Sequence, residues 1–126
     1  MLEEKYINFV EEWCEVLEHK AFAREHGAYS KKQKTTYFWF KINKKYTKII
    51  KTSHGQDSAH AFLCNQTLDV YKAANWATPA KGKRFNLFED FDRILEMCDP
   101  SGSYLYINYY YNKGGLKVYV KDVWRG

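Results

Sequence analysis

The chain has 126 residues, of which 45% are hydrophobic and 18% aromatic, and its net charge is +5. This length and apolar content suffice for the core of one domain over residues 1–126, and they argue against a disordered chain. No apolar run approaches the roughly 20 residues of a membrane span, and the N-terminus lacks a secretory layout. We therefore expect a cytoplasmic protein with no membrane partner.

The cysteine content predicts neither a disulfide framework nor a metal site. Cys14, Cys64 and Cys98 are odd in number and widely spaced, and the sequence has no CxxC or HxxxH pair. We expect reduced thiols and no cofactor.

Charge is strongly segregated along the chain. Residues 1–27 carry a net charge of −4, residues 28–54 hold eight lysines and no carboxylate, and residues 89–99 again carry −4. The two acidic blocks coincide with the two predicted helices. If both helices pack on one side of a sheet, the other side is basic and attracts phosphates or acidic protein surfaces.

The pattern of residues 3–26 predicts one amphipathic helix that ends at Gly27. Its apolar face consists of Tyr6, Phe9, Val10, Trp13, Leu17 and Ala21. Glutamates fill the opposite face.

Residues 35–42 and 45–52 alternate as two strands joined by an Asn43-Lys44 turn. This turn sets Lys41 opposite Tyr46 and Trp39 opposite Lys48. One face would then carry aromatic and basic side chains: Tyr37, Trp39, Lys41, Tyr46, Lys48 and Ile50. The other face would be the core, with Phe38, Phe40, Ile42 and Ile49.

Two more strands, a second helix and a hairpin complete the predicted chain. The strands are 58–64 and 68–72, and Asn86 with Glu89 resembles a capping box at the start of the helix. The helix presents an apolar face of Leu87, Phe88, Phe91, Ile94, Leu95 and Cys98. A hairpin of 103–111 and 116–124 follows, with Tyr110 opposite Lys117 and a second Tyr/Lys face. The predicted fold is α+β: a long N-terminal helix, an antiparallel four-strand meander, a second helix and a C-terminal β-hairpin joining the sheet.

Residues 69–86 form the most distinctive segment, because a tryptophan is followed there by three cations with no carboxylate among them. Trp76 precedes Lys81, Lys83 and Arg84, and the cations come just before the expected helix N-terminus, where an anion is favoured. The alternative is that Trp76 packs on a core edge while the cations balance the acidic second helix.

Rings and lysines on one sheet face are typical of proteins that hold single-stranded nucleic acid. A solvated sheet face and a protein-docking face are the two alternatives. The candidate nucleic-acid or phosphate-binding residues are Lys72, Trp76, Lys81, Lys83, Arg84, Trp39, Lys41 and Lys48.

No motif in the sequence indicates an enzyme. Ser53-His54 and Ser58-x-His60 place hydroxyls near imidazoles, and Asp57 or Asp69 could orient the base, but nothing in the spacing requires it. We predict a non-enzymatic protein with no catalytic residue. A nucleotide-directed enzyme that uses His54 or His60 is the least favoured alternative.

The segment HAFLCNQTLDVYKAANWATPAKGKRFN resembles one found in small uncharacterised proteins of tailed bacteriophages, with the pattern GDVYKAAxWxxPAKxxR. The matching residues are His60, Ala61, Phe62, Asp69, Val70, Tyr71, Lys72, Ala73, Ala74, Trp76, Pro79, Ala80, Lys81 and Arg84. The pattern has glycine where this chain has Leu68. The resemblance implies a viral accessory protein of the host cytoplasm, but it implies no particular activity.

Two functions follow as expectations. The first is a phage-type protein that binds nucleic acid, single strands before duplexes, or nucleotide phosphates. The second is a counter-defence inhibitor that contacts a host protein through the acidic helix, residues 3–18. Oligomeric state stays open, with a homodimer among the alternatives.

Overall fold

The computed structural model describes residues 2–27, 31–111 and 117–121, with residues 107–111 and 117–121 described by their backbone pairing. The expected N-terminal helix is confirmed as α1, Glu4–His26, and ends at Gly27. It buries the side chains of Val10, Trp13, Cys14, Leu17 and Ala21. None of the described helices is both long enough and apolar enough to cross a bilayer.

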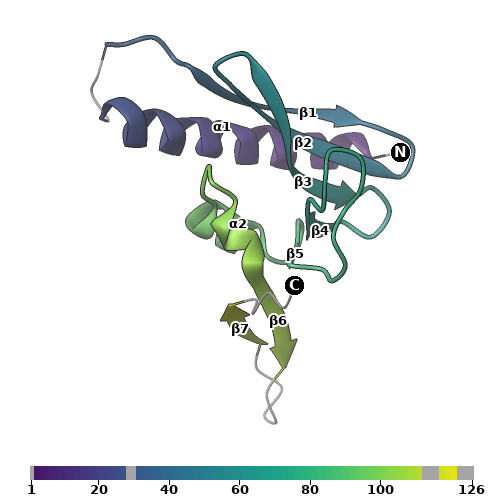
Figure 1. The fold of residues 1–126 in the computed structure, drawn as a ribbon. Helices are drawn as coiled ribbons and strands as arrows, with labels where there is room; N and C mark the ends of the chain where they lie inside the picture. The colour runs from purple at the N-terminus through teal and green to yellow at the C-terminus, as the bar shows by residue number, and fades with distance from the viewer. Residues whose placement is uncertain (1, 28–30, 112–116, 122–126) are drawn as a thin grey trace.

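The sheet is an antiparallel meander of five strands rather than the expected four. The strands are β1 (Thr36–Ile42), β2 (Tyr46–Ser53), β3 (Gln56–Cys64), β4 (Asp69–Lys72) and β5 (Phe85–Asn86), in that spatial order (Figure 1). The additional strand, β5, is two residues long and pairs Val70 with Phe85. So short a segment has no detectable alternation, and for that reason the sequence pattern missed it.

The predicted register of β1 and β2 is wrong by two residues. Lys41 faces Lys48, and Trp39 faces Ile50, because the turn spans residues 43–45 and closes with a hydrogen bond from Asn43 N–H to Tyr46 O. Strand side chains alternate with period two, so a shift of two residues leaves every side chain on its expected face. The predicted division into a core face and an aromatic–basic face is therefore unaffected by the error in register.

Helix α1 packs on the core face of the sheet and also covers its open edge (Figure 1). Phe38 and Ile49 join Trp13 and Leu17 in the main apolar cluster. The Glu18 carboxylate accepts a hydrogen bond from the backbone N–H of Phe38 in edge strand β1, at 3.0 Å. The helix thereby satisfies a backbone donor that would otherwise invite pairing with another chain.

The second helix, α2 (Phe91–Met97), begins four residues later than predicted, with Asp90 rather than Asn86 at its N-cap. The Asn86 side-chain oxygen accepts the N–H groups of Phe88 and Glu89, and the Asp90 carboxylate accepts the N–H of Asn86. These bonds close a turn, so the expected capping box does not start a helix. The turn buries Leu87 and leaves Phe88 62% exposed, which corrects the prediction that Phe88 belongs to a buried face.

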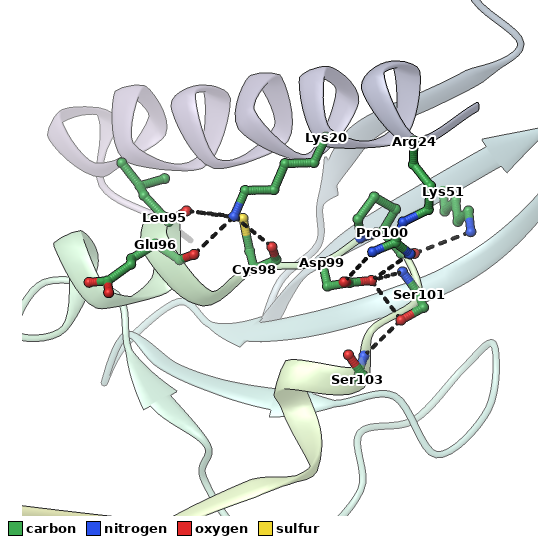
Figure 2. Close-up of polar contacts among 10 residues, drawn as sticks. All are labelled: Lys20, Arg24, Lys51, Leu95, Glu96, Cys98, Asp99, Pro100, Ser101 and Ser103. Atoms are coloured by element: carbon green, nitrogen blue, oxygen red, sulfur yellow. Dashed lines mark hydrogen bonds and ion pairs between the residues drawn. The ribbon is translucent and has the colours of Figure 1, made fainter. Parts of the chain in front are cut away.

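Side chains of α1 fix the C-terminal end of α2 (Figure 2). The ammonium of Lys20 donates to the carbonyl oxygens of Leu95, Glu96 and Cys98 at 2.7–3.1 Å. A cation is favourable at this position because carbonyls at a helix C-terminus lack intrahelical partners. One turn further along α1, Arg24 forms two hydrogen bonds to Asp99 and holds the pKa of that carboxyl well below its usual range.

The C-terminal hairpin does not join the main sheet as predicted. After the 3-10 turn η1 (Ser103–Tyr106), β6 (Ile107–Tyr111) and β7 (Lys117–Lys121) form a separate two-stranded sheet (Figure 1). Tyr110 pairs with Val118 rather than with Lys117. The predicted pairing is therefore wrong by one residue, and the observed pairs include Tyr111 with Lys117 and Ile107 with Lys121.

Candidate nucleic-acid interface

Residues 69–86 fold as a hairpin that places Trp76 at its tip. Beyond strand β4, Ala80 N–H donates to Lys72 O, and Ala73 bridges to Pro79. At the tip, the side-chain oxygen of Asn75 accepts the N–H groups of Ala77 and Thr78 at 2.8 and 3.0 Å. This arrangement is an Asx turn, so the local sequence itself fixes where Trp76 projects.

The hairpin tip brings Trp76 onto the sheet face opposite α1. The ammonium of Lys48, on β2, lies 3.8 Å from the centre of a Trp76 ring and 5.8 Å from the Phe62 ring. Trp76 remains 49% exposed, while Lys48 as a whole is 9% exposed. The lysine stem is thus covered by aromatic rings, and its charged end forms a cation–π contact.

Two lysines stand directly opposite each other at this point. Lys41 on β1 pairs with Lys48 on β2, and no described carboxylate forms an ion pair with either. Burial and the charge of Lys41 together lower the pKa of Lys48. Like charges at directly opposed strand positions are destabilising, so the pair is a place where an anion would be favoured.

Two further exposed rings extend this face along β1. Tyr37 is 44% and Trp39 43% exposed, at alternate positions that end in Lys41. The indole N–H of Trp39 donates to Thr52 Oγ1 at 2.8 Å, and this hydroxyl donates to Asp57. The bond fixes the indole and leaves its ring open. We call the set of Tyr37, Trp39, Lys41, Tyr46, Lys48 and Trp76 the aromatic–lysine face.

Two further rings, which were not among the predicted site residues, lie beneath this surface. Phe62 on β3 and Tyr71 on β4 are cross-strand neighbours, and the Tyr46 ring contacts both edge-on at 6.0 and 6.3 Å. Phe62 is 2% exposed. The alternating pattern of residues 60–64 and 69–72 could have predicted these rings, because it puts Phe62 and Tyr71 on the same sheet face as Lys48.

The other predicted site residues divide into two groups. Lys81 and Lys83 are exposed near the base of the hairpin, where Lys83 lies 3.7 Å from the Asp69 carboxylate. Lys72 is half-buried, and its ammonium lies 4.0 Å from the centre of the Tyr106 ring in η1. These three cations are near the segment that carries Trp76, but the structure records no contact between them and the Lys41–Lys48 pair.

Arg84 lies in the interior, contrary to its expected place on the surface. It is 4% exposed, and its Nε donates to Leu105 O at 2.7 Å, which attaches the hairpin to η1. The argument that placed it beside a helix N-terminus also fails, because α2 starts only at Phe91. We therefore assign Arg84 to the architecture of the fold.

His60 belongs to a buried hydrogen-bond chain. Trp13 Nε1 donates to the Tyr104 hydroxyl at 3.2 Å, and that hydroxyl lies 2.7 Å from His60 Nε2. The Tyr104 hydroxyl therefore bridges the indole of Trp13 and the imidazole of His60. Burial, reinforced by Lys51, lowers the pKa of His60 to about 3. At 8% exposure His60 is closed to a substrate of nucleotide size.

Leu68 adopts a left-handed backbone conformation with φ of 67°. It ends the turn that joins β3 to β4, where its N–H donates to Cys64 O at 2.8 Å. Glycine is favoured in this conformation. This chain therefore forms a turn that favours glycine with a leucine that is 8% exposed.

The fold and this surface define a small α+β protein in which one sheet face packs on a helix and the other presents rings and lysines. Residues 2–107 match the model of DUF7717, a family of unknown function, and the chain belongs to that family. Neither the curated proteins nor the solved structures contain a match. Within the described residues, no group of three or more His, Cys, Asp or Glu side chains is placed to hold a metal.

Proposed function

We propose that this protein binds single-stranded nucleic acid through the aromatic–lysine face, without catalysing a reaction. The observation that carries the proposal is the stack of Lys48 beneath Trp76, next to Lys41, with no described carboxylate paired to either lysine. Phosphate oxygens would supply the negative charge that the Lys41–Lys48 pair attracts. The neighbouring open rings supply surfaces for bases.

The arrangement assigns a role to each side chain. Trp39 and Trp76 stack on bases, each contact worth about 1–3 kcal/mol, while Lys41 contacts the intervening phosphate and Lys48, beneath Trp76, adds its charge. Residues on one face of a strand repeat about every 6.8 Å, so Tyr37 and Trp39 extend the surface past a single nucleotide. Flat rings reach a base face only when the base is unstacked, which favours single strands over duplexes.

The resemblance to phage proteins suggests the biological setting. We place the protein in the cytoplasm of an infected host, as an accessory protein that coats or captures single strands. Lys81 and Lys83, at the base of the Trp76 hairpin, would then guide the strand by charge alone.

Binding of a fluorescein-labelled thymidine oligomer of about twelve nucleotides, followed by anisotropy, tests the proposal. Affinity should fall as salt rises from about 50 to 200 mM, with about 0.7 counter-ions released per phosphate contact. Trp39→Ala and Trp76→Ala should each weaken binding by at least about fivefold, the lower limit for one stacked base.

Controls separate this surface from general attraction to a basic protein. Phe88→Ala removes an exposed ring outside the aromatic–lysine face, and Lys5→Met removes an exposed charge from α1. Both variants should bind like the native chain, whereas Lys41→Met should bind more weakly. The proposal fails if the oligomer does not bind at low salt, or if Lys5→Met weakens binding as much as Lys41→Met.

A further inference from the structure

A groove of about 490 Å³ lies between α1 and the turn that precedes α2. Phe9, Phe88 and Phe91 line it, and the Tyr6 ring contacts Phe9 and Phe88, with centroid separations of 4.6–6.2 Å between neighbouring rings. Phe88, at 62%, is the most exposed large apolar side chain among the described residues. Phe9 and Phe91 pack partly against the core, and Phe88 is the ring that remains open.

Hydrogen bonds of the turn before α2 hold Phe88 on the surface. Its N–H donates to the Asn86 side-chain oxygen at 3.1 Å, while the N–H of Asn86 donates to Asp90 at 2.8 Å. These bonds pin both ends of the turn, and Leu87 occupies the inward position with no exposure. The Phe88 ring cannot turn into the core without breaking them, so the sequence holds it outside.

The rim of the groove is acidic. Glu89, Asp92 and Glu96 line it together with a single cation, Arg93. Residues 89–99 carry a net charge of −4, in contrast to the lysines of the aromatic–lysine face. A polyphosphate is repelled here, so nucleic acid does not account for these rings.

We propose that this groove docks a segment of another protein that carries arginine or lysine beside apolar side chains. Open aromatic faces attract guanidinium and ammonium groups through cation–π contacts, and the carboxylates of Asp92 and Glu96 supply ion pairs. The apolar side chains of the segment cover Phe88 and Phe9. The charge of the rim selects this occupant over an acidic or uncharged one.

The direct test uses a fluorescein-labelled synthetic peptide that alternates arginine with leucine in an alanine–serine background. Its binding to the full chain is followed by anisotropy, and 15N chemical-shift changes should map to residues 6–9 and 88–96. Phe88→Ala and the double variant Asp92→Asn/Glu96→Gln should each weaken binding by about tenfold. A peptide with glutamate in place of arginine should not bind.

Matched variants separate docking from general charge attraction. Glu11→Gln/Glu15→Gln removes two exposed carboxylates from α1 outside the groove, and Trp39→Ala removes a ring from the opposite sheet face. Both should bind the peptide within about twofold of the native chain. An equal loss with Glu11→Gln/Glu15→Gln, or no binding at low salt, overturns the proposal.

A photo-crosslinking side chain at position 88 tests the same surface in producing cells. The proposal requires a crosslink to a cationic segment of a different protein, and that crosslink must be lost in Asp92→Asn/Glu96→Gln. A crosslink to a second copy of this chain would reassign the groove to self-association. A crosslink to an acidic segment would overturn the charge argument.

Discussion

The ammonium of Lys48 lies 3.8 Å from the centre of a Trp76 ring, although one residue belongs to strand β2 and the other to the tip of a later hairpin. This contact assembles the aromatic–lysine face from two separate parts of the chain. It also keeps a lysine with a lowered pKa against an indole. The pKa of Lys48 therefore reports directly on the placement of Trp76.

Trp76→Ala should raise the pKa of Lys48 toward its ordinary value. Burial is the main cause of the lowered pKa, and removal of the indole returns the ammonium to water. NMR titration of the lysine side chains measures this change, with Trp39→Ala as the variant that leaves Lys48 covered. An unchanged titration of Lys48 in Trp76→Ala would contradict the contact.

The free energy of unfolding should fall as pH drops from 7 to 5. The pKa of His60 is about 3 in the folded chain but about 6.5 when unfolded, so the unfolded state binds more protons in this range. Stability is fully present above pH 6.5 and is lost as pH falls toward 3. The expected loss from pH 7 to pH 5 is about 2 kcal/mol by urea denaturation.

His60→Gln should remove most of this pH dependence, whereas His54→Gln should leave it intact, because His54 is exposed in a turn. Below about pH 4 the Asp99 carboxyl adds a second loss of the same sign. Its pKa is lowered by Arg24, so the stability it supplies is also lost on acidification. A flat profile in the native chain between pH 7 and pH 5 would refute a neutral, buried His60.

Arg84→Met should destabilise the fold by about 2–3 kcal/mol, because Leu105 O loses a charge-assisted hydrogen bond while remaining buried. Its neighbour Lys83 provides the control. Lys83→Met breaks a partly exposed ion pair and should change stability by less than about 1 kcal/mol. Thermal or urea unfolding compares the two, and equal effects would contradict the assignment of Arg84 to the interior.

Leu68→Gly should destabilise the protein even though it relieves backbone strain. The left-handed conformation costs a leucine about 1–2 kcal/mol, whereas loss of a buried leucine side chain costs about 2–5 kcal/mol. The net loss should be about 1–3 kcal/mol. A stabilised Leu68→Gly variant would show that the side chain contributes little to the core.

Sequence patterns predicted the long helix and both faces of the β1–β2 hairpin because these depend only on periodicity. Trp13 and Leu17 lie in the core, and Trp39 and Lys41 lie on the opposite sheet face, although the register was wrong by two residues. In the C-terminal hairpin the error was one residue, so Tyr110 pairs with Val118, a position that alternates with the predicted Lys117 along β7. Periodicity tolerates an even shift and not an odd one.

The features that the sequence could not provide depend on contacts between distant residues. Arg84 resembles its exposed neighbour Lys83 in the sequence, and only the position of Leu105 O makes it a buried residue. Phe88 fits an apolar helical face by spacing, but the hydrogen bonds of Asn86 and Asp90 turn it outward. In both cases a specific polar contact overrides a generic pattern.

The hydrogen bond between Trp13 and Tyr104 joins residues 91 positions apart. During synthesis, the ribosome therefore makes the Tyr104 hydroxyl 91 residues after the Trp13 indole that donates to it. At about 5–20 residues per second this interval lasts roughly 5–18 s. The buried hydrogen-bond chain of Trp13, Tyr104 and His60 is therefore completed only after both α1 and the five strands of the main sheet have been synthesised.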